Sequence, residues 1–285
     1  MTEGKLVLCA TPIGNLKDIT FRVIEALKEA DIIAAEDTRN SVKLLNHFDI
    51  KTPMTSYHEY NKVEKGASLV REMLAGKTVA LITDAGTPAI SDPGEELVRQ
   101  CIEAGVTVTS LPGPAACITA LTMSGLATRR FCFEAFLPSE RTDKKERRRV
   151  LEELSDETRT IIIYEAPHHL KKTLEDLGEV LGGSRRIAVI KELTKVHESR
   201  MNLTLESALA YFAENEPRGE YVLVIEGKPE SEREEESRAK WEDLSIREHF
   251  EEYLKGGLER KEAMKAVAKD RGVAKNIIYK ELLDD

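Results

Sequence analysis

One stretch, residues 79–94, decides the fold class: Val79-Ala80-Leu81-Ile82-Thr83-Asp84-Ala85-Gly86-Thr87-Pro88-Ala89-Ile90-Ser91-Asp92-Pro93-Gly94. It opens with four apolar residues, which are typical of a strand buried on both faces. Gly, Pro, Asp, Thr and Ser follow, and these residues supply tight turns and side-chain hydrogen bonds to the backbone. Residues 95–102 then place apolar side chains at helical spacing. This order of strand, loop and helix predicts one unit of an α/β sheet.

The loop of this unit, residues 83–94, favours a ligand site. It is longer than most connections between a strand and the following helix in α/β proteins. Open α/β sheets bind ligands outside the carboxyl ends of their strands, where this loop lies. Asp84 can accept hydrogen bonds from hydroxyl or ammonium groups. An ordinary connection without a ligand is the alternative, and the length and composition of the loop make us prefer a site.

The same alternation of strand and helix recurs along residues 5–228. Strands are predicted at residues 5–9, 31–35, 79–82, 106–110, 131–136, 160–164, 186–191 and 221–226. Helices are predicted at residues 21–27, 40–48, 62–74, 115–123, 168–181 and 205–214. Leu111-Pro112-Gly113-Pro114 interrupts the pattern and is a candidate hinge. We therefore expect an α/β domain at residues 1–112, with a largely parallel sheet, and a second α/β domain at residues 113–228.

The C-terminal region has a different pattern. Residues 229–243 are rich in glutamate and predict an acidic linker. Ser245 and Glu248 have the spacing of a capping box at the start of a helix. Glycines at residues 256–257 and at residue 272 interrupt the apolar periodicity that follows. Residues 244–285 are thus expected to form a small module of three helices with the punctuation of a helix-turn-helix.

Composition excludes several classes of protein. The chain has 285 residues and a formal net charge of −9, which argues against non-specific nucleic-acid binding by the whole surface. Its apolar runs are too short for a transmembrane helix, and its first residues lack the pattern of a signal peptide. The four cysteines are widely spaced and fit buried thiols in a reducing cytoplasm better than disulfides. Motifs for a dinucleotide fold, a P-loop or a zinc site are absent from the sequence.

Six motifs nevertheless occur in order along residues 5–228. They are Ala10-Thr11-Pro12-Ile13-Gly14-Asn15-Leu16, Ala35-Glu36-Asp37-Thr38-Arg39, Thr83–Gly94, Leu111-Pro112-Gly113-Pro114-Ala115, Tyr164-Glu165-Ala166-Pro167-His168 and Glu192-Leu193-Thr194-Lys195. The first four resemble the tetrapyrrole methylase superfamily, and the last two resemble its branch that methylates small-subunit ribosomal RNA. The resemblance implies a two-domain fold of the class III methyltransferases, followed here by the helical module.

This resemblance also implies an activity. It predicts transfer of a methyl group from S-adenosylmethionine to the 2′-hydroxyl of a cytidine in 16S ribosomal RNA, with S-adenosylhomocysteine as product. A soluble homodimer in the cytoplasm, acting on the small ribosomal subunit and on no membrane, is the corresponding expectation. Methylation of a carbon atom in a tetrapyrrole or corrinoid precursor is the first alternative. A binding module that keeps the fold without catalysis is the second.

The resemblance places S-adenosylmethionine in the cleft between the two α/β domains. The residues that it implies for the cofactor are Pro12, Asp84, Ala85, Gly86, Thr87, Ile90, Pro114, Ala115, Ala116 and Ala166. The strand at Tyr221–Val222 is expected to contribute from the second domain. The loop at residues 83–94 is therefore expected to hold the methyl donor and to leave the choice of substrate to other parts of the chain.

The candidates for catalysis lie near these loops. They are Glu36, Arg39, His58 and Lys195. Arg39 and Lys195 are expected to contact a phosphate or hydroxyl group, and His58 is a candidate base because its ordinary pKa lies close to neutral pH. The alternative for residues 36–39 is an ion pair that caps the following helix. The alternative for His58 is an exposed histidine in a loop.

A basic segment supplies the candidates for RNA binding. These are Arg141, Lys144, Lys145, Arg147, Arg148 and Arg149, and only two acidic residues, Asp143 and Glu146, lie among them. A local excess of positive charge on an acidic protein predicts contacts with phosphates. A solvated helix face is the alternative. The helical module at residues 244–285 is expected either to grip RNA or the ribosomal particle, or to serve as an accessory packing unit.

Overall fold

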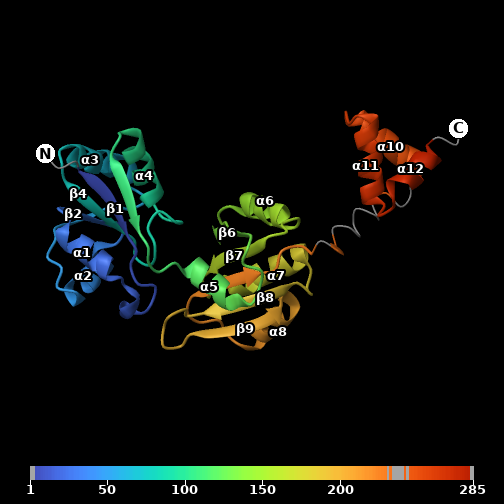
Figure 1. Ribbon diagram of the computed structural model, residues 1–285. Coiled ribbons are helices and arrows are strands. Elements are labelled where there is room, and N and C mark those ends of the chain that lie inside the picture. The colour runs from blue at the N-terminus through green and yellow to red at the C-terminus, as the bar shows by residue number, and fades with distance from the viewer. Residues whose placement is uncertain (1–3, 230, 233–240, 242–243, 283–285) are drawn as a thin grey trace. The chain divides into compact units, whose positions relative to one another are not determined.

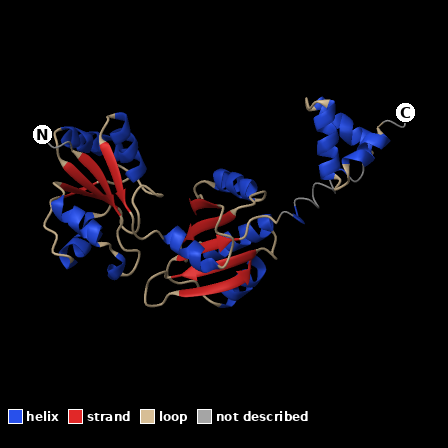
Figure 2. Cartoon of the chain, viewed as in Figure 1, coloured by secondary structure: helices blue, strands red, loops and turns tan. Residues whose placement is uncertain are grey.

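The computed structural model describes residues 4–229, 231–232, 241 and 244–282 (Figures 1 and 2). The chain divides into two compact units. The first consists of Met1–Glu152 and Thr160–Glu226, and it holds two β-sheets. The second consists of Glu153–Arg159 and Gly227–Asp285, and it holds three C-terminal helices. The helices in the described part of the chain lack the combined length and apolar character that crossing a bilayer requires.

The first sheet has five parallel strands in the order β3-β2-β4-β1-β5. Their bounds are β1 Lys5–Cys9, β2 Ile32–Ala35, β3 Met54–Ser56, β4 Thr78–Ile82 and β5 Thr107–Leu111. β1, β2 and β4 are almost wholly buried, as continuous apolar runs in a sheet covered on both faces should be. The predicted parallel sheet is confirmed.

Helices cover both faces of this sheet (Figure 1). One face carries α1 Phe21–Glu29 and α2 Thr38–His47, and the other carries α3 Lys62–Leu74 and α4 Gly94–Glu103. Alternate residues of β1 serve the two cores, because Leu6 packs with the α3 and α4 side and Val7 with the α1 and α2 side. A short 3₁₀ turn, η1 Leu16–Asp18, precedes α1. Because all five strands are parallel, the loops that follow them emerge at the same end of the sheet, beyond the carboxyl ends of the strands.

The second sheet is mixed, in the order β6-β7-β10-β8-β9. Its strands are β6 Phe131–Phe136, β7 Thr160–Glu165, β8 Arg186–Lys191, β9 Ser199–Thr204 and β10 Tyr221–Ile225, and only β6 and β7 pair in parallel. α5 Ala116–Ser124 packs on one face through Cys117, Ala120 and Leu121. The remaining helices are α6 Lys144–Leu154, α7 Leu170–Leu181 and α8 Leu205–Glu214.

Two strands escaped prediction, β3 and β9, and both lie at sheet edges. β3 has three half-buried residues, and β9 has three exposed polar residues and three half-buried ones, so neither has the apolar run that marks a buried strand. Several helix bounds also differ by one or two residues from those predicted, as α2 begins at Thr38 and α7 at Leu170. The hinge at residues 111–114 and the four domain bounds stay predictions.

The C-terminal module contains α10 Ile246–Lys255, α11 Arg260–Asp270 and α12 Lys275–Glu281. Phe250, Val267 and Ile278 contribute one residue from each helix to a shared apolar core. The predicted capping box is present, because the Ser245 hydroxyl accepts from the Glu248 backbone N–H while the Glu248 carboxylate accepts from Ser245. Most of the predicted acidic linker lies outside the described residues.

Candidate functional site

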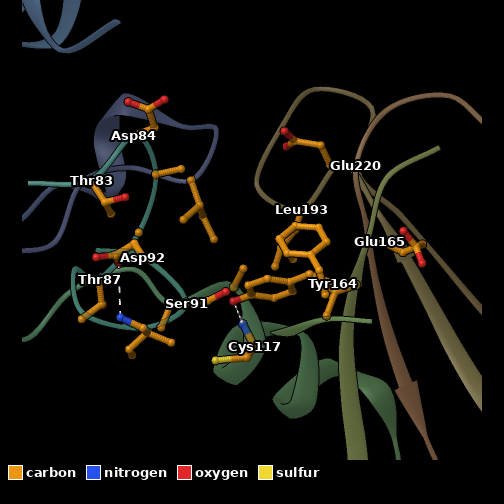
Figure 3. Close-up of a pocket in the computed structure, with 18 of the residues that line it drawn as sticks. Thr83, Asp84, Thr87, Ser91, Asp92, Cys117, Tyr164, Glu165, Leu193 and Glu220 are labelled. Carbon is orange, nitrogen blue, oxygen red and sulfur yellow. Dashed lines mark hydrogen bonds between the residues drawn. The ribbon is translucent and has the colours of Figure 1, made fainter. Parts of the chain in front are cut away.

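A cavity of about 520 Å³ lies in the first unit, where loops of the first sheet face the second sheet (Figure 3). One wall consists of the loops after β1, β2, β4 and β5, with residues 83–87 and 90–92 as its largest part. The other wall is formed by ends of β6, β7 and β10 and by Leu193. In Figure 3, Asp84, Thr87 and Ser91 lie along the first wall, and Tyr164, Leu193 and Glu220 along the second.

The Asp92 carboxylate shapes the loop at residues 83–94. It accepts hydrogen bonds from the backbone N–H groups of Ala89 at 3.0 Å, Ile90 at 3.3 Å and Gly94 at 2.7 Å. Ala89 and Ser91 both have φ of 65°, a left-handed conformation that costs free energy for residues other than glycine. Asp92 thereby holds a strained loop in one shape and satisfies one N–H group, that of Gly94, at the start of α4.

Three loops are joined into one wall by hydrogen bonds. Thr11 and Gly86 exchange two backbone hydrogen bonds at 2.9 and 3.0 Å, and the Thr11 hydroxyl donates to the Thr83 carbonyl at 3.1 Å. Gly86 has φ of 87°, and a Cβ atom there would lie 3.3 Å from the Ile13 side chain. The Thr87 hydroxyl donates to the Pro114 carbonyl at 2.9 Å and so attaches the loop after β5.

The charged groups along the cavity are all carboxylates. Glu36, Asp84, Asp92, Glu165 and Glu220 line it, and the lining described here contains no lysine, arginine or histidine. Several are already engaged, since Glu165 accepts from Thr173 and from the Ala166 N–H, and Glu220 pairs with Lys195 outside the lining. A cavity with this charge favours a cationic ligand over an anionic one.

Asp84 and Glu36 are the carboxylates best placed to receive a ligand. Asp84 is exposed and accepts from the Asp37 N–H at 3.2 Å and the Asn40 side-chain amide at 3.4 Å. Glu36 is half-buried, and one oxygen accepts from the Thr83 hydroxyl at 2.8 Å. Because a carboxylate has about four acceptor positions, both side chains keep capacity for a ligand.

Tyr164 organises the opposite wall. Its hydroxyl accepts the Cys117 backbone N–H at 2.9 Å, and this contact ties β7 to the first turn of α5. Burial raises the pKa of Tyr164, and neighbouring Cys117 raises it further, so the phenol keeps its proton at neutral pH. Ala115 precedes α5 and offers no side-chain cap, so N–H groups of this helix start remain for other acceptors.

Most residues that the resemblance implied for the cofactor line the cavity. These are Asp84, Ala85, Gly86, Thr87, Ile90, Ala115, Ala116 and Ala166. Pro12 and Pro114 do not line it, although Pro12 adjoins Ile13 and the Pro114 carbonyl accepts from Thr87. Tyr221 and Val222 contribute as expected from their strand. The role of all of these residues stays a proposal.

Ile13, Cys117, Phe136, Tyr164 and Leu193 line the cavity without having been singled out from the sequence as site residues. Four of them had a usable signal, because Ile13, Tyr164 and Leu193 lie inside the quoted motifs and Cys117 directly follows Ala116. Phe136 had none, because a phenylalanine at the end of an apolar strand is typical of a core residue.

Of the four catalytic candidates, only Glu36 lines the cavity. The Arg39 side chain is 88% exposed and forms an ion pair with Asp37. Hydrogen bonds from the Arg39 side chain and backbone lower the pKa of Asp37 to about 2. Asp37 also precedes α2 and accepts from the Arg39 N–H at 2.8 Å, which is the capping ion pair of the alternative interpretation. His58 is half-buried in the loop after β3, beside Asn61.

Lys195 is engaged in an ion-pair network outside the cavity lining. Its ammonium group lies 2.9 Å from Glu192 and 2.7 Å from Glu220. Partial burial lowers the pKa of Lys195, but hydrogen bonds to Glu220 and Glu192 raise it more, so the pKa lies above its ordinary value. Lys195 thus stays a cation whose charge is compensated by two carboxylates. A Cβ atom on Gly14 would lie 2.6 Å from the Lys195 side chain, so the first loop packs closely on it.

The basic segment at residues 141–149 is mostly exposed, with one exception that corrects the prediction. Arg141, Lys144, Lys145, Arg148 and Arg149 are exposed. Arg147 is buried, and its guanidinium donates to Asp176, to Thr173 and to the Pro138 carbonyl. Because these bonds consume its donors inside the protein, Arg147 does not belong to an RNA-contacting surface. It supports Thr173, which in turn holds Glu165 at the cavity.

Comparison with known proteins gives matches over most of the chain. Residues 5–209 match the family of tetrapyrrole (corrin/porphyrin) methylases. A protein of Halalkalibacterium halodurans named ribosomal RNA small subunit methyltransferase I is 50% identical over 97% of this chain and 94% of its own length. Proteins of the same name from Synechocystis sp. and Escherichia coli O157:H7 are 46% and 42% identical over 99% of this chain, and over 98% and 96% of their own lengths.

Several solved structures have a fold similar to that of this chain. Uroporphyrin-III C-methyl transferase of Thermus thermophilus, complexed with S-adenyl homocysteine, aligns with a TM-score of 0.55 and 20% identity over 78% of this chain and 97% of its own. A diphthine synthase aligns with a TM-score of 0.59 and 15% identity over 78% of this chain and 90% of its own. At such low identity these likenesses show a shared fold and nothing finer.

Proposed function

The chain belongs to the tetrapyrrole methylase family, and we propose that it is an S-adenosylmethionine-dependent methyltransferase that acts on small-subunit ribosomal RNA. The acceptor atom in this proposal is the 2′-oxygen of a cytidine in 16S ribosomal RNA. Relatives at 42–50% identity, matched over nearly the whole chain, carry a name that specifies the small-subunit RNA. The cavity beside the joined loops is the observation that carries the proposal.

The cavity fits the methyl donor in size and charge. Its volume of about 520 Å³ lies within the range of small-molecule sites. The donor carries an ammonium group and a positively charged sulfur, and the carboxylate lining favours both. Asp84 would accept from hydroxyl or ammonium groups of the donor, and Thr87, Ala115 and Ala116 would supply the adjoining wall. Bound S-adenosylmethionine supplies an electrophilic methyl group to an oxygen nucleophile.

The chain's own contribution to this reaction is mainly positional. The ribose hydroxyl must be held in line with the bond that breaks, and such orientation can account for a large part of the rate. The hydroxyl must also lose a proton, and we assign this proton to Glu36. The Thr83 hydroxyl fixes the orientation of the Glu36 carboxylate at the cavity. A base placed in this way contributes typically 10²–10⁴-fold.

We propose that the exposed cations of the segment Arg141, Lys144, Lys145, Arg148 and Arg149 contact RNA phosphates. The segment begins five residues beyond Phe136, which lines the cavity, so the chain itself connects the two. A homodimer and a cytoplasmic location remain part of the proposal because the family resemblance implies them.

Incubation of the protein with labelled S-adenosylmethionine and small subunits that lack the modification tests the proposal. The expected result is one labelled 2′-O-methylcytidine in 16S ribosomal RNA. Binding of the donor without methylation of the subunit would contradict it. Methylation of a corrinoid or porphyrinogen precursor would support the first alternative, and failure to bind the donor would support the second.

A further inference from the structure

We propose that Phe136 is a stacking platform for the base of the target nucleotide, which enters the cavity displaced from its neighbours in the RNA. The inference rests on the proposed function and names the residue that receives the substrate base. It begins from exposure, because Phe136 is 57% exposed although it lines a cavity. Single-stranded nucleic acids are commonly recognised by stacking of bases on exposed aromatic rings of this kind.

A bulge in β6 directs Phe136 into the cavity. Phe133 is paired with Ile162 of β7 and Phe136 with Tyr164, so three steps along β6 match two steps along β7. Side chains alternate between the faces of a strand, and one extra residue reverses this alternation. Phe136 therefore lies on the same face as Phe133 and Tyr164, which is the face that α5 covers. Without the bulge, Phe136 would lie on the opposite face.

The bulge is maintained at a cost. Ala135 has φ of 51°, a left-handed conformation that is unfavourable for a residue with a Cβ atom. Strain of this kind gathers at functional sites and persists because the surrounding structure enforces it. Here the strained residue directly precedes the aromatic ring that the bulge re-aims. The arrangement does not bury Phe136 itself, since more than half of this residue stays exposed, whereas the next residue, Leu137, is buried.

The Phe136 ring contacts Tyr164 on one side and is exposed on another. Tyr164 meets Phe136 edge-to-face, with ring centroids 5.7 Å apart and planes at 65°. Tyr164 is itself fixed by Phe133, at 4.8 Å, and by its hydrogen bond with Cys117. In Figure 3 Tyr164 lies on the second wall, on the same side as Leu193. Phe136 thus adjoins a rigid aromatic group and presents free surface on which a planar base can stack.

The substrate base, rather than the adenine of the donor, is the occupant that these observations favour. Asp84, the carboxylate proposed to accept from the cationic donor, lies on the opposite wall, after β4. Phe136 ends the edge strand β6, and the following chain leads within ten residues to three exposed cations, Arg141, Lys144 and Lys145. One segment of the chain therefore supplies both an aromatic ring that can stack on a base and cations that can contact the phosphates next to that base.

Substitutions of Phe136 test the platform. Phe136→Ala should raise KM for the small subunit roughly 10- to 100-fold, the effect expected when one stacked base is lost. Phe136→Leu keeps an apolar side chain without an aromatic face and should behave like Phe136→Ala, whereas Phe136→Trp should retain the wild-type KM. Donor affinity, measured by calorimetry, should change less than twofold in all three. Phe21→Ala is the matched control, because Phe21 is exposed but lies outside the cavity.

A second readout is independent of catalysis. Single-stranded RNA containing the fluorescent base pyrrolocytidine should be quenched on binding to the wild-type protein and not to Phe136→Ala. Quenching through Phe136 without methylation would leave the platform standing and refute the proposed function. Methylation with a wild-type KM in Phe136→Leu would refute the platform and leave the function standing. Loss of donor affinity in Phe136→Ala with unchanged quenching would also overturn it, because the ring would then hold the donor.

Discussion

Replacing Asp84 by asparagine removes one negative charge from the proposed donor site, together with a long hydrogen bond from the Asn40 side-chain amide. The asparagine oxygen can still accept from the Asp37 N–H, which lies 3.2 Å from the carboxylate. Asp84 is exposed, so the change leaves no buried group unsatisfied, and the free energy of unfolding should stay within about 0.5 kcal/mol of wild type. A specific effect on the donor can thus be separated from a loss of stability.

The expected loss of affinity follows from the kind of bond removed. A hydrogen bond to a charged group contributes about 1.5–3 kcal/mol, which corresponds to a roughly 10- to 150-fold rise in Kd for S-adenosylmethionine. Isothermal titration calorimetry measures this directly. Asp49→Asn is a suitable control, because Asp49 pairs with Lys51 at the surface and lies outside the cavity lining. Equal donor affinity of Asp84→Asn and wild type would refute the placement of the donor against Asp84.

Three further predictions concern stability. Ala135→Gly should raise the free energy of unfolding, measured by urea titration, by about 0.5 kcal/mol, because relief of left-handed strain outweighs the added chain entropy. Ala135→Val should lower the free energy of unfolding, and the reverse order of the two variants would contradict the strain argument. Arg147→Ala should cost about 2 kcal/mol, because Thr173 and the Pro138 carbonyl lose a buried donor, although Asp176 keeps its ion pair with Lys172. Arg148→Ala, at an exposed pair, should cost less than about 0.5 kcal/mol and mainly weaken RNA binding, and similar costs of the two substitutions would refute the distinction. The pKa of Asp37 is lowered to about 2 in the folded protein, so its contribution to stability is complete above the ordinary pKa and is lost as pH falls toward 2. The thermal unfolding midpoints of wild type and Asp37→Asn should therefore converge as pH falls over that range. A constant difference between the two midpoints would contradict the shift.

Much of the fold could be predicted because its central strands are buried on both faces. The apolar runs at β1, β2 and β4 are explained by helices on both sides of the sheet, and they are visible in the sequence alone. The edge strands β3 and β9 could not be found in this way, because exposed strands need no apolar run. Pairing with a neighbour, which the sequence does not state, is what makes them strands.

The loops of the candidate site could be predicted, but the engagement of single side chains could not. The turn residues of the loop at 83–94 indicate a site on their own, yet the burial of Arg147 depends on Thr173 and Asp176, which are distant in sequence. The ion pair of Lys195 with Glu220 could not be predicted for the same reason, because it requires two loops of the second sheet to meet. The side of the sheet on which Phe136 lies depends on a one-residue bulge, and the hydrophobic periodicity of the sequence does not reveal a bulge of one residue.

The most direct test of the central claim is the identity of the atom that receives the methyl group. Small subunits lacking the modification should be incubated with the protein and with S-adenosylmethionine labelled in its methyl group, and the 16S ribosomal RNA then digested with alkali. A 2′-O-methyl group blocks cleavage at its own nucleotide, so the label should appear in a single alkali-resistant dinucleotide that contains cytidine. Label in mononucleotides, which would mean methylation of a base, or absence of label from RNA despite donor binding, would contradict the account.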